Sequence, residues 1–134
     1  MVDPWLFCWL VVAAVGALGA PVSASNARDT PVLVGGEPTS DACPSQGVVH
    51  GLSPGGSGYL AVRSGPSRHF PMIDRLRNGD SVYFCDERGD WIGIVYGPDP
   101  TICGVSAPLV ERQPYAGACQ SGWAHRKWLA LVAG

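Results

Sequence analysis

Short apolar runs separated by turn-forming residues dominate the chain beyond residue 45. Residues 59–63 alternate large and small side chains, as a half-buried strand does. Residues 81–85 and 91–96 are rich in β-branched and aromatic side chains, so each run predicts a strand. Because Arg88-Gly89-Asp90 supplies a tight turn between these two runs, we predict that they form a β-hairpin.

Weaker segments flank this hairpin. Residues 47–52 predict a short first strand and residues 122–125 a final one, followed by an apolar tail. Residues 70–77 fit either a strand or one helical turn, and Pro71 weakens both interpretations.

The hairpin of residues 81–85 and 91–96 allows two registers. In these, Val82 and Phe84 share a face either with Trp91, Gly93 and Val95 or with Ile92, Ile94 and Tyr96.

Composition favours the same all-β interpretation. The 134 residues include 18 Gly and 12 Pro, a density of turn formers that argues against a helical bundle. The hydrophobic fraction of 46% is that of a globular protein rather than a disordered one. Nine basic and 11 acidic residues give a net charge of −2, which argues against a basic surface for nucleic acid or an anionic membrane.

The N-terminal residues predict an export signal. Residues 5–18 form an uncharged apolar run that is shorter than the roughly 20 residues of a membrane-spanning helix. Val22-Ser23-Ala24 fits the cleavage rule for signal peptidase, so we predict a signal peptide over residues 1–24 and a periplasmic or secreted protein. The alternatives are an uncleaved anchor or a cytoplasmic chain. Asp3 is the only charge before the run, where a signal peptide carries Lys or Arg, so either the start is misassigned or the signal is atypical.

Two further regions complete the expected organisation. Residues 25–46 are short of aromatics and carry several Gly and Pro, so we expect a flexible segment there. Residues 47–134 are the expected domain, and they contain a long insertion over residues 97–122. A loop of that length is uncommon unless it is functional or tied down.

Four cysteines follow the predicted signal: Cys43, Cys85, Cys103 and Cys119. An even number in a small exported domain predicts two disulfides, with three possible pairings. We predict that Cys103 pairs with Cys119 within the insertion, which leaves Cys43 for Cys85. No two of the four have the C-x2-C spacing of a zinc site and the histidines are scattered, so we expect no metal and no cofactor.

Four short motifs occur in order across residues 59–129. Residues 60–66 (LAVRSGP) resemble the first signature of bacterial SH3 (SH3b) domains, L-x-V-R-x-G-P. Residues 78–82 and 89–91 are similar to the second and third signatures, and residues 122–125 (GWAH) with Trp128-Leu129 resemble the last.

This resemblance implies an SH3-like barrel of about five strands. It also implies a ligand groove between the loop near the Arg-x-Gly-Pro turn and the later loops. The insertion departs from the family pattern, in which only a few residues join the third and fourth strands of the barrel. An insertion of this length could reshape or cover the groove.

Six residues are candidates for contact with a ligand, and each has a structural alternative. The aromatic side chains could serve as platforms or could fill the core, and Arg63 could clamp the turn that follows it. His125 neighbours Arg126 and Lys127 and could lie on a solvated face. The six candidates are Tyr59, Arg63, Trp91, Tyr115, Trp123 and His125.

Catalytic signatures are missing from the sequence. It contains no G-x-S-x-G nucleophile motif, and four cysteines that can all pair leave no thiolate for a Cys–His mechanism. We therefore predict a non-catalytic binding module that holds peptidoglycan or a short peptide on an aromatic-lined groove. The alternative is a structural or protein-interaction subunit, an inhibitor or assembly partner, that uses the insertion. A cell-wall hydrolase is a third, weaker hypothesis.

Overall fold

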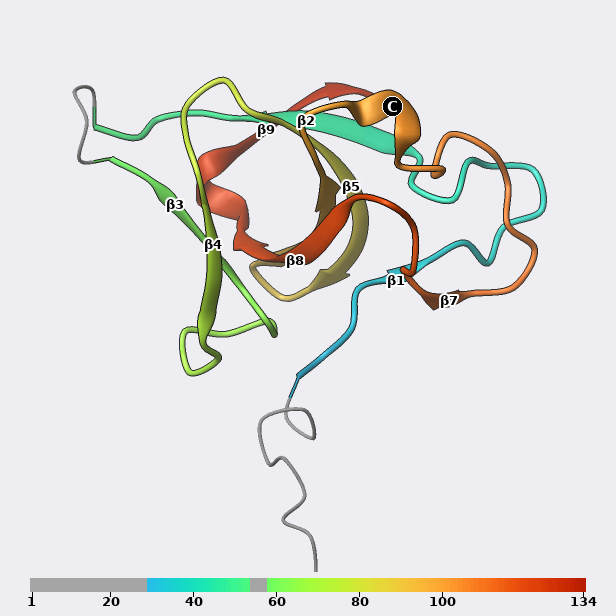
Figure 1. The fold of residues 1–134 in the computed structure, drawn as a ribbon, viewed down its shortest axis with the longest axis horizontal. Coiled ribbons are helices and arrows are strands. Elements are labelled where there is room, and N and C mark those ends of the chain that lie inside the picture. The colour runs from blue at the N-terminus through green and yellow to red at the C-terminus, as the bar shows by residue number, and fades with distance from the viewer. Residues whose placement is uncertain (1–28, 54–57) are drawn as a thin grey trace, which may run out of the picture.

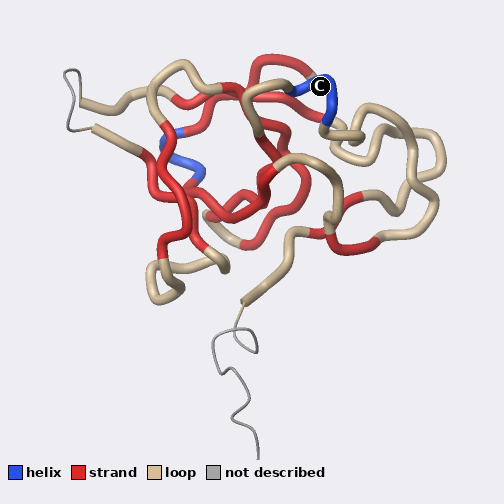
Figure 2. The backbone as a smooth tube through the Cα atoms, viewed as in Figure 1, coloured by secondary structure: helices blue, strands red, loops and turns tan. Residues whose placement is uncertain are grey.

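The computed structural model describes residues 29–53 and 58–134, so the predicted signal peptide lies outside the described residues. The described chain consists of strands, turns and two 3-10 helices, η2 (Pro100–Ile102) and η3 (Arg126–Trp128) (Figures 1 and 2). Seven strands form one antiparallel sheet. Their order is β4 (Met72–Leu76), β3 (Leu60–Arg63), β8 (Gln120–His125), β6 (Trp91–Tyr96), β5 (Ser81–Arg88), β2 (Ser45–Val49) and β9 (Leu129–Ala133). A separate two-stranded ribbon pairs β1 (Leu33–Val34) with β7 (Gln113–Pro114).

The all-β prediction is confirmed, but the number of strands differs from the expectation of about five. The ambiguous residues 70–77 contain strand β4, and the expected apolar tail is strand β9, which pairs with β2. The sheet curls on itself (Figure 1), yet among the described residues no ladder joins its edge strands β4 and β9. The sheet described here is therefore open rather than a closed barrel.

The inner face of the curled sheet carries the first hydrophobic cluster. Val62 and Ile94 are completely buried there, and Val82 and Phe84 pack with the same cluster. The register is therefore the one that places Ile92, Ile94 and Tyr96 on the same face as Val82 and Phe84. A bulge between Phe84 and Asp86 shifts the β5–β6 pairing, which the alternation of residues could not reveal.

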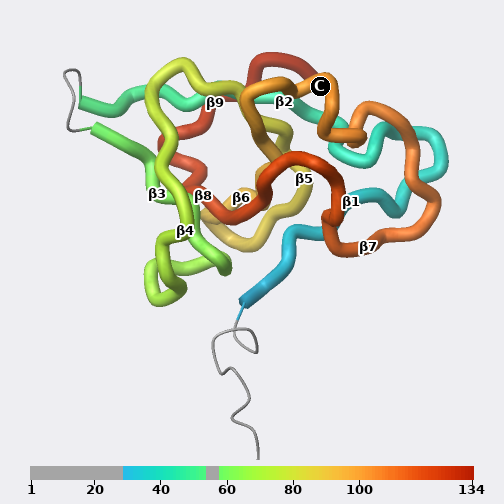
Figure 3. The backbone as a smooth tube through the Cα atoms, viewed as in Figure 1, coloured from blue at the N-terminus to red at the C-terminus, as the bar shows by residue number. Residues whose placement is uncertain are grey.

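A second hydrophobic cluster covers the outer face of β5 and β6. Tyr83 and Val95 point to this side and pack against Val34 from the N-terminal segment and Val105 from the insertion. The two covering segments lie side by side (Figure 3), and backbone hydrogen bonds join them, for example from Cys43 N to Val105 O at 3.2 Å. Strand β6 is thus buried on both faces.

The N-terminal segment is consequently not a loose leader. Val32, Val34, Ala42 and Cys43 are 2–3% exposed. The sequence predicted a flexible segment over residues 25–46, whereas the structure packs its described part, from residue 29 onward, against the sheet. Composition alone suggested mobility, since the segment has few apolar side chains and several Gly and Pro. Those apolar side chains are buried against strands that are distant in the sequence, and composition does not reveal such contacts.

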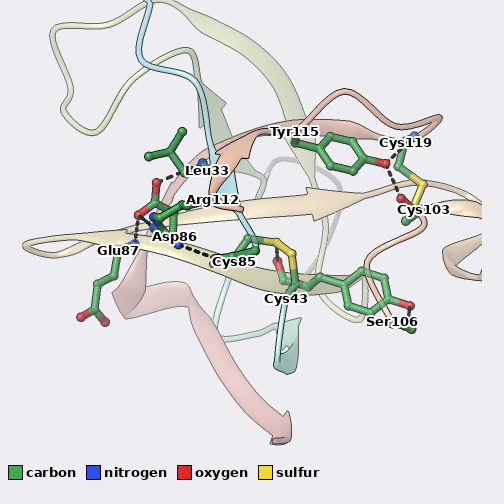
Figure 4. The surroundings of a disulfide bond; sticks show 12 residues. Leu33, Cys43, Cys85, Asp86, Glu87, Cys103, Ser106, Arg112, Tyr115 and Cys119 are labelled. Carbon is green, nitrogen blue, oxygen red and sulfur yellow. Dashed lines mark hydrogen bonds and ion pairs between the residues drawn. A yellow bond between two sulfur atoms is a disulfide. The ribbon is translucent and has the colours of Figure 1, made fainter. Parts of the chain in front are cut away.

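Both predicted disulfides are confirmed, Cys43–Cys85 and Cys103–Cys119 (Figure 4). Cys43–Cys85 ties the N-terminal segment to β5, and Cys103–Cys119 closes the insertion on itself. Two such bonds indicate an oxidising, extracytoplasmic environment.

The carboxylate of Asp86 joins three separate parts of the chain next to the first disulfide (Figure 4). Oδ2 accepts a hydrogen bond from Leu33 N at 3.1 Å, and Oδ1 accepts one from Arg112 Nη2 at 2.9 Å. Arg112 also donates to Gly35 O at 3.2 Å. Since the Asp86 side chain is only 5% exposed, these contacts replace its hydration and hold β1 and the insertion against β5.

We expect Asp86→Asn to lower the free energy of unfolding by about 2 kcal/mol, because it removes a charged acceptor of several hydrogen bonds. Urea denaturation would measure this change. The matched control is Glu87→Gln, which breaks an exposed ion pair with Arg126 and should cost about 0.5 kcal/mol or less. Equal effects of the two substitutions would contradict this role for Asp86.

Candidate functional site

Four of the six candidate ligand residues line one hollow on the surface. Tyr59, Arg63, Trp91 and His125 meet there around a volume of about 190 Å³. We call this hollow the β3–β8 groove. Its remaining lining residues are Leu60, Ala61, Arg68, Lys127 and Trp128.

The sheet itself positions the wall of the groove. Trp91 opens β6 and lies opposite His125 in the β6–β8 register, and their rings meet edge to face with centroids 5.3 Å apart. In β3, Leu60 and Val62 are buried in the inner cluster, so the alternating residues Ala61 and Arg63 face outward. Strand pairing thus fixes the backbone positions from which these side chains extend.

Arg63 holds the turn that follows β3. Its Nη1 donates to Phe70 O at 3.0 Å, while its Nε is buried and has no hydrogen-bond partner. The contact is the clamp that the sequence suggested. The same guanidinium lines the groove, so the structural and the ligand-contact interpretations are compatible.

Cations stack on two of the aromatic rings at the groove. The guanidinium carbon of Arg75 lies 4.5 Å from the centre of the Tyr59 ring, and that side of the groove is open, with Tyr59 39% exposed. Lys127 Nζ lies 5.0 Å from the centre of the Trp128 ring. These contacts hold the rings in place without covering them fully.

His125 begins the 3-10 helix η3. Its Nδ1 accepts a hydrogen bond from Lys127 N at 3.1 Å. The neutral ring therefore carries its proton on Nε2, which leaves that nitrogen as a donor.

Two candidate residues lie elsewhere and serve the fold. Trp123 is completely buried, and its Nε1 donates to Thr30 O at 2.7 Å, so it is a core residue beneath the N-terminal segment. Tyr115 lies in the insertion, where its hydroxyl donates to Cys103 O at 2.7 Å and accepts from Cys119 N at 3.0 Å (Figure 4). Trp123 is thus packed in the core, where its side chain is not exposed to solvent, and Tyr115 braces the second disulfide.

Sequence reasoning missed Arg68, Lys127 and Trp128 as groove residues. Lys127 and Trp128 directly follow His125, so a cation beside an aromatic residue was a usable signal. Arg68 lies in the turn clamped by Arg63, and only the folding of that turn brings it to the groove.

Three hollows in the described part of the chain are larger than this groove. One of about 260 Å³ lies in the insertion and includes Tyr115, and the other two gather none of the six candidates. One of about 610 Å³ lies between β5 and β9, and its rim includes the ion pairs of Arg112 and Arg126. The other, of about 400 Å³, contains Asp74 and Tyr96, whose hydroxyl donates to Asp74 Oδ2 at 2.7 Å. Burial raises the pKa of Tyr96 well above its usual range, and the hydrogen bond to Asp74 and its negative charge act in the same direction. Tyr96 therefore remains protonated and serves as a fixed donor.

Within the described residues, no group of three or more His, Cys, Asp and Glu side chains could hold a metal ion. The same part of the chain has no helix long and apolar enough to cross a membrane. No family model, curated protein or solved structure matches this chain.

Proposed function

We propose that this protein is a non-catalytic binding module of the cell envelope that holds peptidoglycan or a short peptide in the β3–β8 groove. The observation that carries the proposal is the convergence on one hollow of Tyr59, Arg63, Trp91 and His125, which come from three separate segments of the chain. The two disulfides support a location outside the cytoplasm.

The chemistry of the groove suits binding of an extended chain. Aromatic side chains give large contact area at a low cost in conformational entropy, and the sheet holds Trp91 in place before a ligand arrives. The Nε2 of His125 and the cationic side chains add polar contacts that would fix the orientation of a ligand.

We also propose that the chain is a divergent SH3-like domain. The groove lies between the turn after Arg63 and the segment that joins β8 to β9, which agrees with the groove that the resemblance implies. The insertion lines no part of it, so the departure from the family pattern leaves this groove open.

A sedimentation assay with insoluble cell-wall sacculi tests the binding proposal. We expect the protein to pellet with sacculi. We expect Trp91→Ala to weaken binding about tenfold or more, because it removes an aromatic ring that lines the groove and packs against His125. Tyr59→Ala should weaken binding in the same direction, since it removes an exposed ring at the groove margin.

The matched control is Ile102→Ala, which removes an exposed apolar side chain from the insertion rather than from the groove. This variant should pellet like the parent. Failure of the parent protein to pellet would contradict the proposal for peptidoglycan.

A protein-interaction subunit is the second candidate function. Its support is the exposure of Ile102 and Val110 in the insertion, at 53% and 71%. Under this alternative Ile102→Ala, and not Trp91→Ala, would abolish capture of a protein partner.

A further inference from the structure

We infer that the β3–β8 groove selects ligands that carry carboxylates next to an apolar group, so that negative charge is part of what it recognises. This inference rests on the proposed binding function and specifies its ligand class. The starting observation is the charge of the lining, which includes Arg63, Arg68 and Lys127 but no Asp or Glu.

These three cations are not neutralised within the protein. In residues 29–53 and 58–134 the ion pairs involve Arg112 with Asp86 and Arg126 with Glu87, and none of the groove cations takes part in one. Their positive potential is therefore available to a ligand, and it is strongest where the groove excludes water.

The positive groove does not follow from overall charge, because the chain carries a net charge of −2. Of the acidic groups, Asp74 and Asp80 line the 400 Å³ hollow, and Asp86 is occupied in the contacts that hold the N-terminal segment. Asp90 precedes Trp91 in the chain, but it is exposed and does not line the groove. Such segregation of charge is the pattern expected when one surface favours a partner of opposite sign.

The aromatic rings narrow the ligand class further. Trp91 and Trp128 line the same hollow as the cations, so a ligand must combine anionic and apolar groups at short spacing. Peptide segments with a free carboxylate meet this requirement, whether they belong to the cell wall or to a soluble peptide. Guanidinium and ammonium groups bind such carboxylates through charge-assisted hydrogen bonds.

Chemical amidation of carboxylates gives a direct test. Sacculi would be divided into two halves, and one half would be treated with carbodiimide and ethanolamine to convert its carboxylates to neutral amides. The fraction of protein that pellets with each half would then be compared. A soluble acidic tripeptide and its amidated form, compared by calorimetry, distinguish a cell-wall source from a free peptide. We expect amidation to weaken binding about tenfold, the effect of losing one well-formed charge-assisted contact of roughly 1.4 kcal/mol.

Charge variants of the protein provide the second arm. Arg68→Gln and Lys127→Gln should each weaken binding to untreated sacculi and reduce the difference between untreated and amidated material. Lys127→Arg keeps the charge, so it should preserve the difference between untreated and amidated material that Lys127→Gln reduces. The double variant Arg68→Gln/Glu37→Gln restores the parent's net charge by removing an exposed acidic group away from the groove, and it should remain as weak as Arg68→Gln.

The outcomes separate the two levels of the proposal. Equal binding to untreated and amidated ligand would overturn carboxylate selection while leaving the binding function in place. Recovery of binding in the Glu37 double variant would also overturn it, because net charge rather than the groove would then be responsible. No binding to any of these ligands would overturn both the inference and the proposed function.

Discussion

Trp123→Ala is expected to lower the free energy of unfolding by about 3–5 kcal/mol, the range for removing a fully buried large aromatic side chain. The indole is completely buried, and its Nε1 donates to Thr30 O at 2.7 Å. Alanine would therefore leave a cavity under the N-terminal segment and would free the carbonyl that anchors it. Chemical denaturation followed by far-ultraviolet circular dichroism measures the change.

Trp123→Phe is the matched control, because it keeps an aromatic ring and loses only part of the volume and the Nε1 hydrogen bond. We expect its free energy of unfolding to lie between those of the parent and of the alanine variant. If Trp123→Ala were as stable as the parent but defective in ligand binding, Trp123 would be a ligand residue after all, and its assignment to the core would be wrong.

Replacing both cysteines of the first disulfide, in Cys43→Ala/Cys85→Ala, is expected to destabilise the fold by about 4 kcal/mol, since the bond spans 42 positions and restricts a long loop of the unfolded chain. Stability of a small domain is only about 5–15 kcal/mol, so this loss could unfold much of the population at 37 °C. Thermal melting under non-reducing conditions provides the measurement.

The comparison variant is Cys103→Ala/Cys119→Ala, whose bond spans 16 positions and should contribute about 3 kcal/mol. Its effect should concentrate in the insertion, where Tyr115 connects Cys103 and Cys119 by hydrogen bonds. Hydrogen exchange should then increase in residues 97–119 before it increases in β5 and β6. A larger global loss from the second bond than from the first would contradict this assignment.

These predictions have a common structural reason. The N-terminal segment and the insertion form a second layer over β5 and β6, and Cys43–Cys85, Asp86 and Trp123 are the points where that layer is attached. The β3–β8 groove lies outside the attached insertion, so the covering layer can add stability without blocking it.

Local sequence signals determined most of the strands. Alternation of large and small side chains placed β3, and β-branched and aromatic runs placed β5 and β6. The turn residues between β5 and β6 predicted their hairpin, with Gly89 at φ 59°. The sequence also predicted the correct pairing of the cysteines. Cys103 and Cys119 are close in sequence within one long loop, so joining them closes the shortest loop.

The tertiary structure decided the features that depend on contacts between distant segments. The open seven-stranded sheet, the bulge that sets the register after Phe84, and the burial of both faces of β6 all require residues far apart in the sequence. The different roles of Trp91 and Trp123 also depend on distant contacts. The sequence around each residue predicts a strand, but Trp91 lines the groove, whereas the N-terminal segment covers Trp123 and places it in the core. The sequence by itself determined an all-β, disulfide-bonded chain, because strand propensity and turn chemistry act over a few residues, and it named four of the nine groove residues. Which side chains are covered and which face solvent was decided by long-range packing, which no local pattern encodes.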